Sequence, residues 1–222
     1  MIKTSNILLI GGGGLGVIAA LSLEASSRAK VTAVLRSNYE TVSANGYKIS
    51  SCEYGEIEGW RPTKNNFVNK IPHPSSNDRV YDYIVITTKN IPGLGRTMAA
   101  LIAPTVSPGI TVIVLIQNGF NIEREYRERY QAISSYLASA LPVRKRQDQA
   151  GSNIRATIIY LLAPFRVQRS TRHAGNSIEY EYLVGEPMRE GLRLGVPMPT
   201  ISMIYSLCQA VQSGIMQRRK SV

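Results

Sequence analysis

Residues 5–16 read SNILLIGGGGLG, and this stretch decides the fold. Its first half ends in a continuous apolar run, as a strand buried on both faces of a parallel sheet does. Four glycines follow, and apolar residues then recur at near-helical spacing from Leu15 to Leu23. Residues 30–35 form a second apolar run of strand length. The order strand, glycine-rich turn, helix, strand predicts a βαβ unit.

The residues after this unit continue the alternation of strands and helices. Residues 82–88 read DYIVITT, a strong pattern for a buried strand, and residues 110–116 are another. A helix is predicted between them at 95–103, whereas prolines and an Asn-Gly turn divide residues 37–80 into short strands and loops. Strands that alternate with helices are typical of an open parallel sheet. We therefore predict an α/β protein with a Rossmann-type doubly wound sheet, whose first domain covers residues 1–122.

The end of the chain has its own helical signals. A short helix is predicted from Glu186 to Gly195, because a proline stands in its first turn and the glycine can close it. A last helix is predicted over 200–213, with Gly214 as its stop. One face of this last helix is apolar, formed by Ile201, Ile204, Tyr205, Cys208 and Val211. Residues 178–222 are therefore predicted to be an α-helical C-terminal part, and the apolar face must pack on another part of the protein.

The positive charge of the chain is concentrated between these two parts. The sequence has 26 Lys and Arg residues against 15 Asp and Glu, a net charge of +11. Residues 129–177 contain eight basic and one acidic side chain, and so carry seven of the eleven units. Residues 123–177 form an atypical basic segment without a predicted fold, in which 158–163 is an isolated apolar run. The basic cluster at 144–146 is short and has no interleaved aromatic residue, so we expect no nucleic-acid binding.

Other function classes are disfavoured by what the sequence lacks. Cys52 and Cys208 are too far apart for a metal-ligand pair, and neither His73 nor His173 has a second ligand at a suitable spacing, so we expect no metal site. The longest purely apolar run is residues 112–116, far short of a membrane span. The first apolar run is too short for a signal-peptide core. We expect a cytoplasmic protein with no membrane association.

The glycine-rich turn matches the motif G-x-G-x-x-G. Its members are Gly11, Gly12, Gly13, Gly14, Leu15 and Gly16. The first glycine permits a tight turn, the second lets a pyrophosphate approach the backbone, and the third lets the helix pack closely on the strand. The helix N-terminus then meets the phosphate charge. This context favours dinucleotide binding, and the alternative is an ordinary glycine-rich turn.

The residue after the second strand indicates which dinucleotide is bound. An Asp or Glu there would accept hydrogen bonds from the ribose hydroxyls of NAD, but this chain has Arg36. A guanidinium cannot accept such a bond, and it can hold a 2′-phosphate with two parallel hydrogen bonds. The sequence therefore favours NADP(H). The alternative is an arginine that is simply solvated at the surface.

Two further polar residues follow predicted strands. Lys89 comes directly after the strand at 82–88, and Asn118 follows the strand at 110–116. Open α/β sheets bind their ligands at the carboxyl ends of their strands, where both residues are expected. Lys89 could equally be a surface loop lysine, and Asn118 with Gly119 could be a simple turn.

The chain resembles a known family, the ketopantoate reductases (2-dehydropantoate 2-reductases). The resemblance lies in residues 7–23, in Arg36 after the second strand, in YDYIVITTK at 81–89 and in LIQNG at 115–119. A further block, GNSIEYEYLVGEP from residue 175 and its continuation through VPMP at 196–199, is similar to the C-terminal end of the family.

This resemblance implies a reaction and roles for named residues. It implies NADPH-dependent reduction of the 2-oxo acid 2-dehydropantoate to pantoate, a step toward pantothenate and coenzyme A. Arg36 would hold the 2′-phosphate, and Lys89 and Asn118 would contact the cofactor. Asn118 would also touch the substrate, and Glu179 would contact the nicotinamide end. The family commonly dimerises through its helical domain, which makes a homodimer an expectation for this chain too.

The chain departs from the family in its middle. The resemblance implies a catalytic lysine with an asparagine four residues later, but no lysine in this chain has an asparagine at that position. Only 60 residues separate Asn118 from Glu179. The catalytic residue is therefore unknown, and we expect weak or absent turnover, since a proton donor typically contributes about 10²–10⁴-fold. A frameshift, splice product or deletion over residues 129–177 would explain this departure. Residues 178–222 would then be the remnant of a truncated α-helical C-terminal domain, and the apolar face of the last helix should be partly exposed or wrongly packed. The alternatives are a catalytically impaired NADP(H)-binding remnant, a reductase of a related 2-oxo acid, and a basic binding protein.

Overall fold

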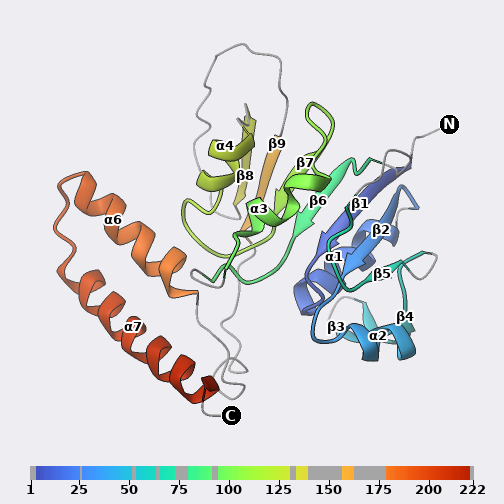
Figure 1. Ribbon diagram of the computed structural model, residues 1–222, viewed down its shortest axis with the longest axis horizontal. Coiled ribbons are helices and arrows are strands. Elements are labelled where there is room, and N and C mark those ends of the chain that lie inside the picture. Colours follow the sequence, from blue (N-terminus) through green and yellow to red (C-terminus); the bar gives the residue numbers. More distant parts are fainter. Residues whose placement is uncertain are drawn as a thin grey trace.

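A parallel β-sheet forms the centre of the molecule (Figure 1). The computed structural model describes residues 4–25, 27–51, 54–63, 66–73, 80–91, 95–130, 134–139, 157–162 and 179–220. Seven strands pair in this sheet, and all their pairings are parallel. In order across the sheet they are β5 (Phe67–Val68), β2 (Ala29–Val34), β1 (Ser5–Ile10), β6 (Tyr83–Ile86), β7 (Val112–Leu115), β9 (Thr157–Leu162) and β8 (Ser134–Ser139).

The strand order places a switch point in the middle of the sheet. From β1 the chain builds outward through β2 to β5, and it then returns to the other side of β1 to form β6 and β7. Numbered by their order in the chain, the strands β1, β2, β5, β6 and β7 lie in the sheet in the order 3-2-1-4-5, as in Rossmann-type sheets. The predicted α/β fold is confirmed, and ligand binding in such a sheet is expected outside the carboxyl ends of β1 and β6, where the order reverses.

Helices and a small hairpin surround this sheet. The helix α1 (Gly14–Ala25) connects β1 to β2, and the hairpin of β3 (Tyr47–Ser51) and β4 (Gly55–Trp60) forms a second, antiparallel sheet. The remaining elements of this part are α2 (Tyr39–Asn45), α3 (Met98–Ile102), the 3₁₀ turn η2 (Ala103–Thr105) and α4 (Arg124–Tyr130).

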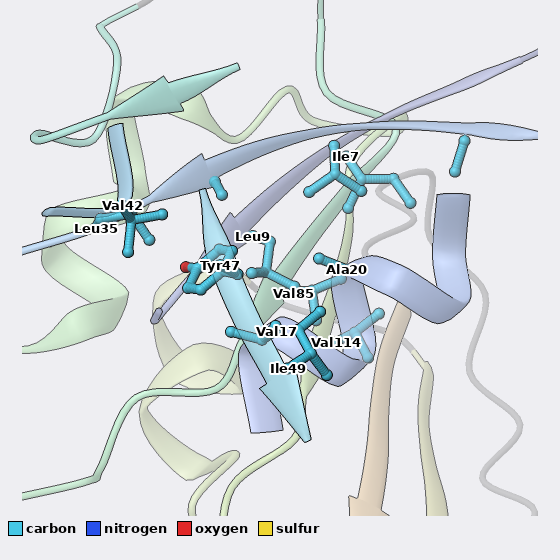
Figure 2. Packing of buried hydrophobic residues seen from close by; sticks show 13 residues of the cluster. Ile7, Leu9, Val17, Ala20, Leu35, Val42, Tyr47, Ile49, Val85 and Val114 are labelled. Atoms are coloured by element: carbon cyan, nitrogen blue, oxygen red, sulfur yellow. The ribbon is translucent and has the colours of Figure 1, made fainter. Parts of the chain in front are cut away.

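Two hydrophobic clusters lie on the two faces of the sheet. Ile7 and Leu9 of β1 belong to the cluster that includes α1 and the β3–β4 hairpin, which Figure 2 shows from close by. Leu8 and Ile10 of the same strand belong to the other cluster, which includes residues of α3 and α4. Successive residues of a strand point to opposite faces. A strand that is apolar at every position is therefore buried on both sides, as its sequence predicts.

The C-terminal helices lie to one side of the sheet (Figure 1). They begin with the π-helical turn η3 (Glu181–Gly185) and continue as α6 (Glu186–Arg193) and α7 (Pro199–Lys220). The prediction that Gly214 ends the last helix is wrong, because α7 continues to Lys220. A glycine inside a helix costs only about 1 kcal/mol, and good helix formers follow this one. The predicted apolar face is partly exposed: Ile204 and Val211 remain 41% and 56% accessible.

Other predicted elements need correction. Residues 39–45 form the helix α2 in a region predicted to contain only strands and loops. The helix predicted over 95–103 begins at Met98, because Thr97 caps it. The side chain of Thr97 accepts a hydrogen bond from the backbone N–H of Ala100. The basic segment without a predicted fold contributes α4, β8 and β9, and β9 includes most of its isolated apolar run. His173 and the basic cluster at 144–146 lie outside the described residues.

Two features are absent from the described part of the chain. No helix in it is long and apolar enough to cross a membrane. The same residues contain no cluster of three or more His, Cys, Asp and Glu side chains that could hold a metal ion.

Candidate functional site

The turn between β1 and α1 is built so that two of its glycines admit no side chain. Gly11 has a φ of +122°, and a Cβ atom on it would lie 2.5 Å from Thr87 Oγ1. A Cβ on Gly16 would lie 1.9 Å from the carbonyl oxygen of Gly11. The first position therefore needs the conformational freedom of glycine, and the last needs its lack of volume. Both roles are those of the first and third glycines in the motif.

The middle of the same turn faces open space. A Cβ on Gly13 or Gly14 would have no atom within 4 Å, although Gly12 between Gly11 and Gly13 is enclosed by Leu35, Tyr47 and Asn38. The helix α1 begins at Gly14, and the N–H groups of a first helical turn have no intrahelical partners. An anion can therefore approach the backbone here and meet the positive end of the helix dipole.

Two side chains that sequence reasoning missed hold this turn in place. Thr87 Oγ1 donates toward the carbonyl oxygens of Ile10 and Gly11, each at 3.2 Å. Asn38 Nδ2 donates to the carbonyl oxygen of Gly12 at 2.9 Å. These bonds join residues far apart in the chain, so no local pattern marks them. The available signal is position alone, since Thr87 follows β6 and Asn38 follows β2 at the same edge of the sheet.

Arg36 lies where the sequence predicts it, just beyond the carboxyl end of β2. Its side chain is exposed, and its carbonyl oxygen accepts a hydrogen bond from the N–H of Tyr39 at the start of α2. Since β2 is the neighbour of β1 in the sheet, this guanidinium follows the strand adjacent to the glycine turn. Asn38, which binds the carbonyl oxygen of Gly12, stands two residues further on.

Lys89 and Glu179 come together, although they are far apart in the sequence. Lys89 is exposed three residues beyond β6, and the N–H of its neighbour Asn90 donates to Glu179 Oε1 at 3.0 Å. Burial raises the pKa of Glu179, while the Asn90 N–H and the positive charge of Lys89 partly offset this effect. The contact brings a carboxylate from the C-terminal part to the carboxyl end of β6.

Asn118 and its neighbours follow β7 at the same edge. Asn118 is half-buried, and Gln117 beside it is only 5% exposed. Gln117 Nε2 donates to the carbonyl oxygen of Thr88 at 2.6 Å, which ties the end of β7 to the residue before Lys89. Within the described part of the chain, Gln117 Oε1 is buried without a hydrogen-bond partner. Gln117 is a third residue whose importance the sequence does not reveal, since its bonds form only after β6 and β7 pair.

The residues present fit a dinucleotide. The open space at Gly13 and Gly14 admits a pyrophosphate, and Arg36 offers a cation beside the end of β2. The buried Oε1 of Gln117 is an acceptor that the described residues leave unsatisfied near the other end of the site. These features lie on one edge of the sheet, at the carboxyl ends of neighbouring strands.

The sheet order and the glycine turn define the class, a Rossmann-type α/β protein followed by a helical C-terminal region. Residues 7–152 match the family described as "Ketopantoate reductase PanE/ApbA", and residues 169–212 match its C-terminal region. Because the first match covers more than half of the 222 residues, the chain belongs to the ketopantoate reductase family. The two matches also extend into the basic segment from both sides and leave only 153–168 between them.

The chain is also similar to individual proteins. An uncharacterized protein of Saccharomyces cerevisiae, YDL144C, is 40% identical over 144 residues, which are 57% of this chain and 40% of that protein. The chain thus spans less than half of that relative. The crystal structure of 2-dehydropantoate 2-reductase from Methylococcus capsulatus matches with 31% identity over 57% of this chain and 37% of its own, at a TM-score of 0.45. A probable 2-dehydropantoate 2-reductase of Bacillus subtilis matches over 93% and 99% of the two chains, with 12% identity and a TM-score of 0.56, and so supports the fold alone.

Proposed function

We propose that this chain binds NADP(H) across the carboxyl ends of β2, β1, β6 and β7 and reduces a 2-oxo acid, with 2-dehydropantoate as the first candidate. The observation that carries the proposal is the glycine turn at the switch point of the sheet. There Gly11 and Gly16 exclude any side chain, whereas Gly13 and Gly14 leave open space. The family to which the chain belongs supports the same class of reaction.

The glycine turn and Arg36 would hold the phosphates. The pyrophosphate would lie beside Gly13 and Gly14, with Leu15 in the same first turn of α1, where the helix dipole favours negative charge. Arg36 would form charge-assisted hydrogen bonds with the 2′-phosphate of the adenosine ribose. Thr87 and Asn38 would keep the turn in the conformation that leaves this space open. Thr87 donates to the carbonyl oxygens of Ile10 and Gly11, and Asn38 donates to that of Gly12.

Lys89, Asn118 and Glu179 would form the other end of the site. The nicotinamide, when bound, supplies a hydride to the carbonyl carbon of the substrate. As negative charge develops on the carbonyl oxygen, the ammonium of Lys89 and the amide of Asn118 could stabilise it by donating hydrogen bonds. Glu179 would keep the Lys89 ammonium near this position by its charge, since the two groups interact electrostatically. Asn118 would in addition orient the substrate.

A second candidate function is an NADP(H)-binding protein with little turnover. It is favoured by one observation: the sequence has no lysine with an asparagine four residues later, the pair that the family resemblance implies for proton transfer. A missing general acid typically lowers the rate by about 10²–10⁴-fold. Reduction by this chain is therefore expected to be slow, although cofactor binding should not depend on that pair.

Two measurements on the full chain test the proposal. Titration with NADPH and NADH, followed by the fluorescence of the nicotinamide, should show tighter binding of NADPH. NADPH oxidation should then be measured with 2-dehydropantoate and with related 2-oxo acids such as pyruvate. Slow oxidation that depends on one of these acids supports the reductase, and binding without oxidation supports the second candidate. Absence of NADPH binding would overturn both.

A further inference from the structure

A short segment from the C-terminal part crosses the two loops that carry Lys89 and Asn118. We call residues 179–186 the strap. It contacts the loop after β6 through Glu179, and the loop after β7 through Tyr182 and Glu186. These contacts join the C-terminal helices to the edge of the sheet where the cofactor is proposed to bind.

The first contact lies beside Lys89. Glu179 Oε1 accepts a hydrogen bond from the backbone N–H of Asn90 at 3.0 Å, and the carboxylate also interacts with the charge of Lys89. A backbone N–H that is bonded to a fixed carboxylate restricts the φ and ψ angles around it. The strap therefore limits the positions that the Lys89 main chain can take.

The second contact lies beside Asn118. The N–H of Phe120 donates to the carbonyl oxygen of Tyr182 at 2.8 Å. Gly119, between Asn118 and Phe120, has a φ of +137°, and a Cβ on it would lie 2.6 Å from Tyr182 Cβ. The loop and the strap thus touch at the backbone level, with no room for a larger residue.

The third contact is a half-buried ion pair through Glu186. Its Oε2 lies 3.2 Å from Arg124 Nη2 and accepts from Asn121 Nδ2 at 3.5 Å, while its Oε1 bonds Arg189 on its own helix at 2.8 Å. The Glu186 side chain is 14% exposed and that of Arg124 is 53% exposed, so water screens this pair mainly from the arginine side. Asn121 has a positive φ of 56°, which for a residue other than glycine marks a constrained turn.

We propose that the strap positions the loops bearing Lys89 and Asn118 for the cofactor, with Glu186 as its main positioning residue. This inference rests on the proposed function, because it concerns the same site. If docking of the strap favours the loop geometry that binds NADPH, then NADPH binding must favour docking of the strap by the same factor. The C-terminal helices and the cofactor site are then energetically coupled through the three contacts.

The test compares Glu186→Gln with Glu190→Gln in the full chain. Both substitutions remove one negative charge from α6, and Arg124 acts electrostatically on Glu190 too. The hydrogen bonds of Glu190, however, go to Arg193 on its own helix. Two readouts are needed: the hydrogen-exchange rate of the Phe120 amide without cofactor, and the Kd for NADPH. We expect E186Q to increase both by about three- to tenfold, and E190Q to change neither.

Each alternative outcome has a distinct meaning. Faster exchange with an unchanged Kd overturns the positioning role, because the contact is then purely structural. If E186Q and E190Q give the same exchange rate and the same Kd, Glu186 does not hold the loop and the proposal is wrong. If the wild-type chain does not bind NADPH, the proposed function and the coupling fall together, while the exchange difference still reports whether the contact exists. Should E186Q fail to fold, Arg124→Gln breaks the same ion pair, with Arg127→Gln in the same helix as its control.

Discussion

The apolar side chains of the sheet are buried, whereas many of those in the C-terminal helices are exposed to solvent. Leu8, Ile84 and Leu115 in the sheet are fully buried, whereas Met203 and Leu207 of α7 remain 61% and 60% exposed. The sheet is held by its two hydrophobic clusters. The C-terminal part is joined to it through hydrogen bonds and ion pairs, among them those of Glu179 and Glu186, and through Tyr182, which packs against one of the clusters. The sheet is thus fixed by extensive apolar packing, whereas the C-terminal part is attached to it by one half-buried tyrosine and a few polar contacts.

The largest difference in stability is expected between two leucine-to-alanine substitutions, one in the sheet and one in α7. Leu115→Ala removes a fully buried side chain and should lower the free energy of unfolding by about 2–5 kcal/mol. Leu207→Ala removes an exposed one and should change it by less than about 0.5 kcal/mol. Urea unfolding followed by circular dichroism measures both. A loss of similar size at Leu207 would contradict the comparison and would mean that this face of α7 is covered in solution, as in a homodimer.

A second comparison separates stability from binding within the glycine turn. Gly16→Ala places a methyl group against the carbonyl oxygen of Gly11 and should lower stability by about 1–3 kcal/mol. Gly13→Ala points into open space and should leave the unfolding transition nearly unchanged. It should nevertheless weaken NADPH binding by about tenfold, because its methyl group occupies the space of the pyrophosphate. Equal NADPH affinity in Gly13→Ala and wild type would show that the cofactor does not lie there.

The preference for NADPH should depend on one cation. Arg36→Gln should raise the Kd for NADPH by about tenfold, equivalent to about 1.4 kcal/mol, and leave the Kd for NADH unchanged. Arg28→Gln, an exposed arginine at the other end of β2, is the matched control and should change neither value. Isothermal titration or nicotinamide fluorescence gives the four constants. An equal loss for both cofactors would argue against a 2′-phosphate contact.

The smallest effect concerns the pH dependence of the strap. Burial raises the pKa of Glu179 above its usual value of 4.5, so the folded chain binds a proton more tightly than the unfolded chain. Ionisation of Glu179 therefore lowers stability as the pH rises from 4.5 through the raised pKa. Relative to wild type, Glu179→Gln should gain roughly a few tenths of a kcal/mol over that range, since solvent screens the partly exposed carboxylate.

Glu190→Gln provides the control of opposite sign. The hydrogen bond from Arg193 lowers the pKa of Glu190, so its ionised form stabilises the fold above pH 4.5 and this contribution is lost as the pH falls. The E190Q variant should therefore lose stability relative to wild type above that pH. Thermal unfolding between pH 4 and 7 measures both variants. Parallel curves for wild type and E179Q would disprove the effect of burial.

The local patterns predicted the first strands of the sheet because a buried strand and the turn after it can each be recognised within a few residues. The apolar run ending at Ile10 and the glycines after it predict a buried strand and a tight turn, and the structure has both. Lys89 and Asn118 were placed by strand ends alone. The helix α2 does not follow from the local pattern, because it has only seven residues, includes Thr41, Val42 and Ser43 and ends at an Asn-Gly turn. The strand β8 does not follow either, because SSYLAS has no strong strand pattern.

The supporting residues of the site could not be found in this way. Gln117, Thr87 and Asn38 act through hydrogen bonds to segments that are distant in the sequence, and such bonds leave no periodic signal. Glu179 was reached only through the resemblance of a block of residues to a family. Its contact with Asn90 spans 89 positions, and no rule based on spacing predicts a pair of that separation.

The strap also determines how strongly the length of the chain before it affects the fold. The chain between α4 and the strap adds β8 and β9 to the sheet, and the ion pair of Arg124 with Glu186 joins the two segments that flank this stretch. The entropy lost in closing a flexible connection grows slowly with its length, by only about 0.6 kcal/mol for each doubling. A change in the number of residues between α4 and the strap should therefore cost little, as long as β8 and β9 keep their places and the ion pair still forms.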